Sequence, residues 1–295
     1  MRQKVVILNK IGMSKVWFVT GASKGLGLNL VEKLLKSGHK VAATSRNKKQ
    51  LTEKVSENSD NFLPLAMDLT DENDVKSTIG KVLSYFGGID VVVNNAGYGL
   101  GGAIEELQHD EVHQNFDVNV YGSLHVIRNI LPGMRERGSG HIMNIASIGG
   151  FVATFPGYGI YCATKFAVQG FSEALEAEVK PLGIHVTCVS PGYFRTEFLS
   201  SDSMQTGERT IDVYEFARET VRVHAQDIHG NQAGDPAKAA DVFIKLSKMD
   251  NPPTHLYLGS DAYEFVNQKI ANLQEMMEAH KSLGVSTDFE NVNAS

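Results

Sequence analysis

The sequence has few cysteines, no long apolar run and no excess of positive charge, and each absence excludes a class of protein. Two cysteines in 295 residues cannot form a disulfide framework and do not give the spacing of a zinc site. No stretch reaches the roughly 18 uncharged apolar residues of a membrane-spanning helix. The 34 acidic side chains outnumber the 28 basic ones, and the net charge of −6 argues against nucleic acid as a partner. We therefore expect a cytoplasmic protein with no metal and no membrane contact.

The chain does have the composition of one large globular core, with 42% hydrophobic and 21% charged residues. Short β-rich runs alternate with amphipathic segments of helical length, which is the pattern of a parallel sheet with crossover helices. This predicts an α/β fold, a single doubly wound Rossmann-like domain whose mostly parallel seven-stranded sheet is flanked by helices. The expected strands are 16–19, 40–44, 62–67, 89–93, 141–146, 185–190 and 255–258. The expected helices are 25–37, 47–57, 71–86, 104–134, 159–180, 235–248 and 261–280.

Three segments fall outside this alternation. Residues 1–12 precede the first strand pattern and are expected to be an N-terminal extension to a domain spanning 13–280. Between 193 and 234 the chain has only a modest helical pattern near 214–224, and such a long irregular connection favours a lid over a ligand site. Residues 281–295 are polar without periodicity, so we expect a frayed tail.

A glycine-rich turn, TGASKGLG at residues 20–27, joins the first strand to the first helix. Glycine allows the required backbone angles and the close approach of a pyrophosphate, while the helix N-terminus offers amide donors. Glycines also occur in plain turns, but this position between strand and helix predicts a dinucleotide site. Its expected contacts are Gly21, Ser23, Lys24, Gly25, Leu26 and Gly27.

Charge near the end of the second strand indicates which dinucleotide is bound. An NAD site needs a carboxylate about 20 residues after the glycines, yet no acidic residue lies between Glu32 and Glu53. Instead, Ser45 and Arg46 stand at the strand end, and Lys24 lies in the glycine turn. These groups favour the extra phosphate of NADP(H) over NAD(H). The alternative is that the basic residues only form a solvated helix start.

Tyr161 and Lys165 are four residues apart and share one face of a predicted helix. A nearby ammonium lowers the pKa of a phenol, so Tyr161 could exchange a proton with an alcohol or carbonyl. Such a pair alone is more often a surface pair. Ser147, however, follows the fifth strand at the edge where α/β sheets bind ligands, although it could instead cap its own turn. Asn119 is a polar residue inside a predicted helix, where asparagine is unfavourable, so we expect it to have a specific role there.

These motifs resemble the short-chain dehydrogenase/reductase family, of the type with TGxxxGxG and YxxxK. The match runs from about Lys15 to Tyr263 and includes Asn94-Asn95-Ala96-Gly97 and Pro191-Gly192 followed by Thr196. One departure is the spacing of fourteen positions from Ser147 to Tyr161, one more than is usual in the family, which we place at Thr154 in the connecting loop.

The resemblance implies roles for individual residues. Tyr161 would be the acid/base, Lys165 would hold the nicotinamide ribose, Ser147 would orient the substrate oxygen, and Asn119 would support a water that links Lys165 to solvent. Ser45 stands where NAD-preferring relatives carry aspartate. The other implied cofactor contacts are Asp68 and Leu69 at the adenine, Asn94, Ala96 and Gly97 along the cofactor, and Pro191, Gly192 and Thr196 at the carboxamide.

The expected function is that of an NADP(H)-dependent oxidoreductase, which makes 13–280 a catalytic domain and 193–234 its substrate lid. It would interconvert a secondary alcohol and a ketone, or an aldehyde, by hydride transfer. The alternative is an NADP(H)-binding sensor or regulator without catalysis. We expect an apolar substrate, because the predicted pocket wall is apolar and aromatic: Tyr98, Leu100, Phe151, Phe155, Tyr158, Tyr193, Phe194, Phe198 and Leu199.

We also expect a homodimer or homotetramer. The resemblance places the interface on helices 104–134 and 159–180, and Phe166, Phe171, Leu175 and Val179 give the second helix more apolar surface than one sheet face needs.

Overall fold

The computed structural model describes residues 14–55 and 59–289, and its central sheet confirms the predicted fold. The seven-stranded sheet has the order β3-β2-β1-β4-β6-β7-β9, and every pairing in it is parallel. The order reverses between β1 and β4, a switch point where doubly wound sheets bind ligands. The strands are β1 (Val16–Val19), β2 (Lys40–Ser45), β3 (Phe62–Ala66), β4 (Val91–Asn94), β6 (Gly140–Ile145), β7 (Ile184–Pro191) and β9 (His255–Leu258).

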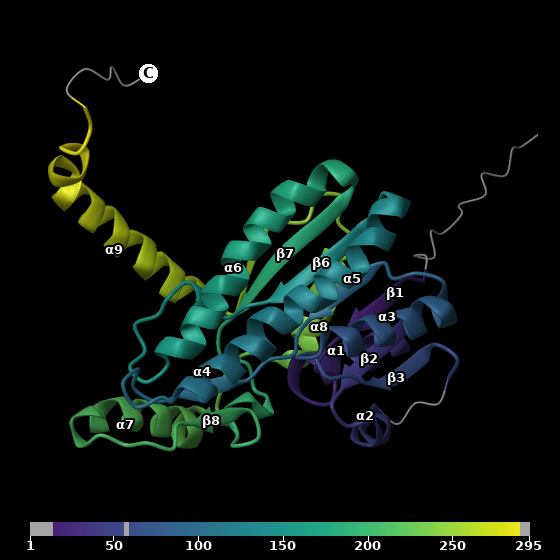
Figure 1. Ribbon diagram of the computed structural model, residues 1–295, viewed down its shortest axis with the longest axis horizontal. Helices are drawn as coiled ribbons and strands as arrows, with labels where there is room; N and C mark the ends of the chain where they lie inside the picture. The colour runs from purple at the N-terminus through teal and green to yellow at the C-terminus, as the bar shows by residue number, and fades with distance from the viewer. Residues whose placement is uncertain (1–13, 56–58, 290–295) are drawn as a thin grey trace, which may run out of the picture.

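Helices cover both faces of the sheet (Figure 1). Successive strand residues point to opposite faces, so Trp17 and Val19 pack with α1 (Gly25–Lys36), α2 (Lys48–Val55) and α8 (Pro236–Leu246). Phe18 packs on the other face with α3 (Glu72–Phe86), α5 (Gly122–Arg137) and α6 (Gly159–Val179). Because both faces are covered, the central strands are buried almost throughout.

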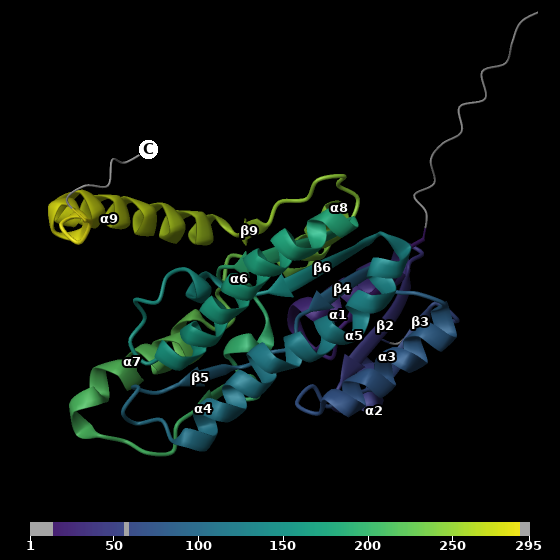
Figure 2. The ribbon, with the colours of Figure 1, turned by 45° about the horizontal axis from the view of Figure 1, so that its top comes forward.

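Two predicted segments differ in the structure. The single helix expected at 104–134 starts later and is divided into α4 (His109–Phe116), a π-helical turn (Asp117–Tyr121) and α5. The tail expected from 281 is wrong at its start, because α9 (Ser260–Val285) continues as a helix beyond residue 280. Good helix formers propagate an existing helix even without a packing face. In both ribbon views α9 projects away from the body (Figure 2), and from 267 to 285 it buries no residue.

The segment 193–234 has more structure than its sequence indicated. Its helix α7 (Glu215–Val223) lies where the modest helical pattern was, but β8 (Met204–Thr206) was not predicted. β8 pairs in parallel with β5 (Gly99–Gly101) as a separate two-stranded sheet.

Buried and half-buried carboxylates hold this segment to the body. The Glu106 carboxylate accepts hydrogen bonds from the Ile211 amide at 2.8 Å and from the Arg218 guanidinium. The Glu111 carboxylate accepts one from the Glu208 amide at 3.0 Å. These contacts fix the segment across α4 rather than leaving it as an irregular connection.

The extension expected at 1–12 lies outside the described residues. Among the described residues, no helix combines the length and the apolar character needed to cross a bilayer.

Candidate active site

A cavity of about 340 Å³ lies at the carboxyl ends of the central strands, and most of the predicted site residues line it. These are Gly21, Ser23, Lys24, Gly25, Leu26, Ser45, Arg46, Asp68, Leu69, Ala96, Gly97, Ser147, Tyr161, Lys165, Pro191, Gly192 and Thr196. The predicted contacts Gly27, Asn94 and Asn119 do not line the cavity. The strands bring together residues separated by as many as 175 positions (21 and 196) because their carboxyl ends meet at one edge of the sheet.

The glycine turn provides a space that fits the phosphates of a dinucleotide. Gly21 and Gly25 have φ values of 63° and 58°, a region that favours glycine. A Cβ on Gly21 would lie only 2.7 Å from the Cα of Ala96. Helix α1 starts at Gly25 with no side-chain cap at Lys24 and no acidic residue in its first turn. Its first amide groups are therefore available to an anion in the cavity.

Gly27 and Asn94 lie behind the residues that line the cavity. A Cβ on Gly27 would lie 2.6 Å from the side-chain nitrogen of Asn95, so glycine is needed for close packing. Asn95, which does line the cavity, donates from its Nδ2 to the carbonyl oxygens of Thr20 and Gly21, both at 3.0 Å. Asn94 is buried and donates to Asn144 on the neighbouring strand at 2.8 Å. Gly27 and Asn94 thus shape the site without reaching its surface.

Two cations lie at the end of the cavity formed by β2. Arg46 is exposed, lines the cavity and makes no ion pair within the described part of the chain. Burial lowers the pKa of Lys24, the Asp202 carboxylate opposes this, and the charge of Arg46 adds to the lowering. The Lys24 ammonium also donates to the carbonyl oxygen of Asp202, at 3.1 Å, across the mouth of the cavity. This end fits an anionic group.

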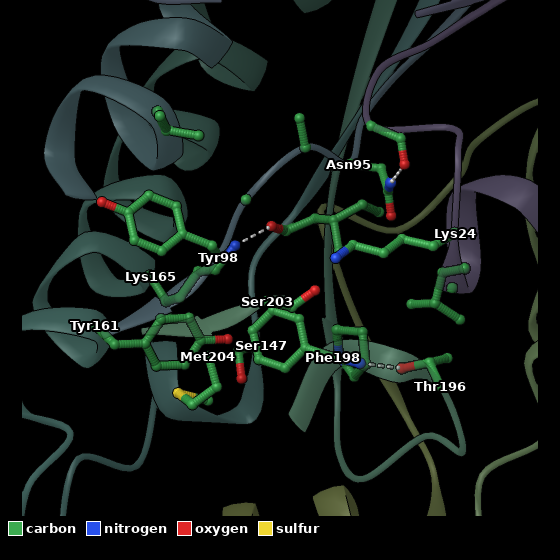
Figure 3. A pocket seen from close by; sticks show the side chains of 18 of the residues that line it. Lys24, Asn95, Tyr98, Ser147, Tyr161, Lys165, Thr196, Phe198, Ser203 and Met204 are labelled. Carbon is green, nitrogen blue, oxygen red and sulfur yellow. Dashed lines mark hydrogen bonds between the residues drawn. The ribbon is translucent and has the colours of Figure 1, made fainter. Parts of the chain in front are cut away.

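Tyr161, Lys165 and Ser147 meet on the opposite wall of the cavity (Figure 3). Tyr161 and Lys165 project from α6 and are 9% and 5% exposed. The Lys165 ammonium lies 5.9 Å from the centre of the Tyr161 ring and donates to the carbonyl oxygen of Ile145 at 2.9 Å. Ser147 follows β6, and its Oγ accepts a hydrogen bond from the Gly149 amide at 3.1 Å.

Burial acts on the pKa of both groups of this pair, and the expectation that Lys165 lowers the pKa of Tyr161 stays a prediction. Desolvation raises the pKa of Tyr161, and the hydrogen bond from Ser147 opposes this only in part. Desolvation also lowers the pKa of Lys165 to about 8. The ammonium bonds to the Ile145 carbonyl rather than to the phenol, so its charge favours the phenolate less than burial disfavours it. At neutral pH the phenol therefore retains its proton and is a proton donor.

Asn119 lies in the π-helical turn and holds the chain beside Lys165. Its Oδ1 accepts from the Tyr98 amide at 3.0 Å, and its Nδ2 donates to the Tyr98 carbonyl at 3.0 Å and to the Thr164 hydroxyl at 3.1 Å. A Cβ on Gly97 would lie 3.0 Å from Asn119 Oδ1 and 3.4 Å from Lys165 Nζ. The water expected from the family resemblance remains a prediction.

The chain after β7 closes the cavity against the glycine turn. The Gly192 amide donates to the carbonyl oxygen of Leu258 at 2.8 Å. Thr196 caps a short helical turn by accepting from the Phe198 amide at 3.3 Å. Gly25 and Thr196 lie close together, since a Cβ on Gly25 would be 3.5 Å from the Thr196 side chain. The glycine turn and the chain after β7, which are far apart in the sequence, therefore meet here.

Seven of the nine predicted wall residues line the cavity, namely Tyr98, Phe155, Tyr158, Tyr193, Phe194, Phe198 and Leu199. Leu100 is buried away from the cavity, and Phe151 packs against Tyr257 at a ring separation of 6.0 Å. The sequence did not indicate several residues that also line it, among them Ser203, Met204, Gln205, His224 and Gln232. They belong to the segment 193–234, where only tertiary contacts decide which side chains face inward.

A sequence model of a protein family, described as short chain dehydrogenase, matches residues 15–206 of this chain. The chain belongs to the short-chain dehydrogenase family. An oxidoreductase of Botryotinia fuckeliana is 36% identical over 279 residues, which cover 93% of this chain and 100% of that protein. A 3-ketodihydrosphingosine reductase of Bacteroides thetaiotaomicron is 35% identical over 247 residues, covering 83% of this chain and 88% of that one. The crystal structure of a short-chain dehydrogenase from Streptomyces avermitilis matches with a TM-score of 0.86 and 35% identity, over 94% of this chain and 100% of that chain.

Two further solved structures in this family hold nicotinamide cofactors. ElxO with NADP bound has a TM-score of 0.70 and 28% identity, over 85% of this chain and 100% of that chain. A 3-ketoacyl-(acyl-carrier-protein) reductase from Brucella melitensis complexed with NADH has a TM-score of 0.68 and 27% identity, over 83% of this chain and 96% of that chain. Similar folds therefore accept either cofactor, and the choice depends on individual side chains.

Proposed function

We propose that this short-chain dehydrogenase is an NADP(H)-dependent oxidoreductase that interconverts a ketone or aldehyde and the corresponding alcohol on an apolar substrate. The observation that carries the proposal is the meeting of the buried Tyr161 phenol, Ser147 and Lys165 on the wall of the cavity that also contains the glycine turn. The glycine turn and the N-terminus of α1 would hold NADPH, which would provide the hydride for the substrate carbon. The chain supplies the proton and the geometry.

The protein groups act on the substrate oxygen. Ser147 holds this oxygen beside Tyr161, whose buried phenol donates its proton as the carbonyl becomes an alcohol. The positive charge of Lys165 stabilises the phenolate that remains. The phenol is protonated at neutral pH, which is the form that donates a proton in reduction, and in the reverse reaction the phenolate would accept one.

The preference for NADP(H) rests on charge. Arg46 and Lys24 both line the cavity, and Ser45 stands where a carboxylate would repel a phosphate. The NADP-bound relative is consistent with this choice, while the NADH-bound relative makes it a question to test. The apolar substrate is supported by the aromatic wall and by the relative named for reducing a keto group.

The direct test measures NADPH oxidation with a panel of apolar ketones for the wild type and for Tyr161→Phe. We expect turnover to fall by about 10² to 10⁴-fold in the variant, with an unchanged Kd for NADPH by calorimetry. Tyr85→Phe, at an exposed position of α3, is the matched control and should behave as the wild type. Equal turnover in Tyr161→Phe would disprove the catalytic role. If the wild type binds NADPH but reduces no ketone, the result would favour the alternative of an NADP(H)-binding sensor or regulator without catalysis.

We further propose a homodimer or homotetramer through α5 and α6, with a smaller apolar surface than the sequence suggested. Leu175 and Val179 are buried within the monomer, and Phe171 packs against the same core. Phe166 of α6 is 43% exposed, and Tyr121, in the π-helical turn before α5, is 50% exposed. A monomeric mass in solution would disprove this assembly, whereas a dimer broken by Phe166→Glu would support it.

A further inference from the structure

The part of the cavity covered by 193–234 contains polar atoms that an apolar substrate would leave without partners. The Tyr158 side chain is 4% exposed, lines the cavity, and its hydroxyl has no hydrogen-bond partner in the structure. Gln232 is 3% exposed, lines the cavity, and neither polar atom of its amide has a partner. Buried polar groups are normally satisfied, because an unmade hydrogen bond costs free energy. These groups therefore point to a ligand atom.

The geometry around Tyr158 defines what that atom can be. The His224 ring lies 4.9 Å from the Tyr158 ring and 5.7 Å from the Tyr193 ring, centre to centre. His224 Nδ1 lies 2.8 Å from the Thr220 carbonyl oxygen, which only accepts, so Nδ1 carries the proton. In the neutral ring, Nε2 then accepts from the Tyr193 hydroxyl at 2.8 Å. Tyr193 has used its donor and remains an acceptor, whereas the Tyr158 hydroxyl is free to donate and to accept.

Tyr158 is held in place from several sides. Its amide donates to the Phe155 carbonyl at 3.1 Å, and its carbonyl accepts from the Cys162 amide at 2.8 Å. The preceding residue, Gly157, has a φ of 81° and accepts from the Gly102 amide at 2.8 Å. Tyr158 directly precedes α6, three positions before Tyr161, and both side chains belong to one buried cluster and line the cavity. Its hydroxyl is therefore a fixed group beside the reacting centre.

The side chains packed around this hydroxyl are mostly aromatic and apolar. The rings packed around it belong to Tyr193, His224 and Phe155, and the nearby Arg195 is exposed, with its Nε donating to the Gln232 backbone carbonyl at 3.1 Å. A carboxylate or phosphate would lose its hydration here without gaining a buried cation. A hydroxyl can both donate and accept at no such cost.

We infer that Tyr158, with the acceptor oxygen of Tyr193, forms a specificity subsite for an uncharged hydroxyl group of the substrate. The substrate class is thus a hydroxy ketone, or the corresponding diol, on an otherwise apolar skeleton. This inference rests on the proposed function, because it names the substrate of the same site. It goes further by requiring a second polar group on the molecule, apart from the carbonyl.

The test compares 2-decanone with 2-decanones that carry one hydroxyl at successive carbons from C4 to C10, and with 9-oxodecanoate. We expect the wild type to prefer one or two of the hydroxy ketones over 2-decanone by about tenfold in kcat/KM, as one satisfied buried hydroxyl gives. Tyr158→Phe removes the hydroxyl oxygen and keeps the ring. In this variant, kcat/KM for the preferred hydroxy ketone should be within about twofold of kcat/KM for 2-decanone. Tyr85→Phe should keep the wild-type ratio. Because the readout is a ratio between substrates, a general loss of activity does not imitate the effect.

Three results would overturn the subsite: no preferred hydroxyl position in the wild type, a preference that survives in Tyr158→Phe, or a preference for 9-oxodecanoate. Loss of the preference in Gln232→Leu alone would assign the hydroxyl to Gln232 and also contradict the role of Tyr158. The Kd values of the same compounds, measured by calorimetry in the Tyr161→Phe background, give a second readout without turnover. If no ketone is reduced, the proposed function is wrong, and these Kd ratios still decide the subsite.

Discussion

The two sides of the cavity are built in different ways. The cofactor side consists of strand ends and a glycine turn, whose positions follow from the parallel pairing of β1 with β2 and β4. The substrate side is the segment 193–234, which is held by side chains of other elements, such as the buried Glu106 and the half-buried Glu111. The first is set by the main chain of the sheet. The second depends on a few polar contacts, so single substitutions should affect the two sides differently.

The largest effect is expected on the cofactor side, from Gly21→Ala. The new Cβ would meet the Ala96 backbone at 2.7 Å in a conformation that only glycine adopts easily, so the turn must move. We expect NADPH affinity to fall by a factor on the order of 100 or more, because a displaced turn loses several phosphate contacts. Gly38→Ala is the control, since its φ is also positive, at 76°, but nothing lies within 4 Å. An unchanged Kd in Gly21→Ala would show that the turn does not hold the cofactor.

A smaller effect is expected on the substrate side, from Glu106→Gln. The amide would place a donor against the Ala103 or Ile211 amide or against Arg218, all of which donate to the carboxylate now. We expect the population with 193–234 open to rise roughly tenfold or more, measured by hydrogen exchange of the α7 amides. Glu215→Gln removes the exposed partner of the same Arg218 and should change exchange little. Equal protection in both variants would contradict the importance of the buried contact.

Arg46→Ala tests the end of the cavity next to β2, where we expect the additional phosphate of NADPH. Loss of one charge-assisted contact should reduce the preference for NADPH over NADH by about tenfold in kcat/KM. Lys48→Ala, which removes an exposed cation outside the cavity, is the matched control. If both variants keep the wild-type ratio, the cations near β2 do not select the cofactor.

The smallest effect is a pH dependence that follows from the pKa of Lys165, about 8. Loss of the ammonium should lower kcat/KM for reduction about fourfold from about pH 7 to about pH 8.5. Stability should move in the opposite direction. Because the pKa is lowered in the folded state, the unfolded chain binds more protons above about pH 8, and the free energy of unfolding from this group rises with pH up to about 10.4.

These opposite signs separate titration of Lys165 from denaturation. Urea unfolding at each pH is the control for the activity profile. A fall in stability that parallels the fall in activity would contradict this assignment. A flat activity profile to pH 9 would contradict a catalytic role for the Lys165 charge.

Much of the cofactor side could be predicted from the sequence. The alternation of strands and helices fixed which residues follow a strand, and in a parallel sheet those residues share one edge. The motif residues Gly21, Ser147, Tyr161 and Thr196 were thus expected together, and all four line the cavity. Gly27 and Asn94 do not line the cavity, because a local pattern does not distinguish a residue in the wall from one behind it.

The substrate side could be predicted only in outline. The sequence indicated an aromatic wall, but it gave no sign of the pairing of β5 with β8 or of the inward position of His224 and Gln232. The sequence also gave no sign of the hydrogen bond from Lys165 to the Ile145 carbonyl, because spacing along a helix says that Lys165 is near Tyr161 but not which acceptor it binds.

The sequence by itself determined the sheet, the glycine turn and the pairing of a tyrosine with a lysine on one helix, because these depend on hydrophobic periodicity and on neighbours along the chain. Only the tertiary structure decided how 193–234 closes the cavity, which polar groups stay without partners, and how burial sets their charges. Burial is a property of everything packed around a group, and the residues that bury it here come from distant parts of the chain.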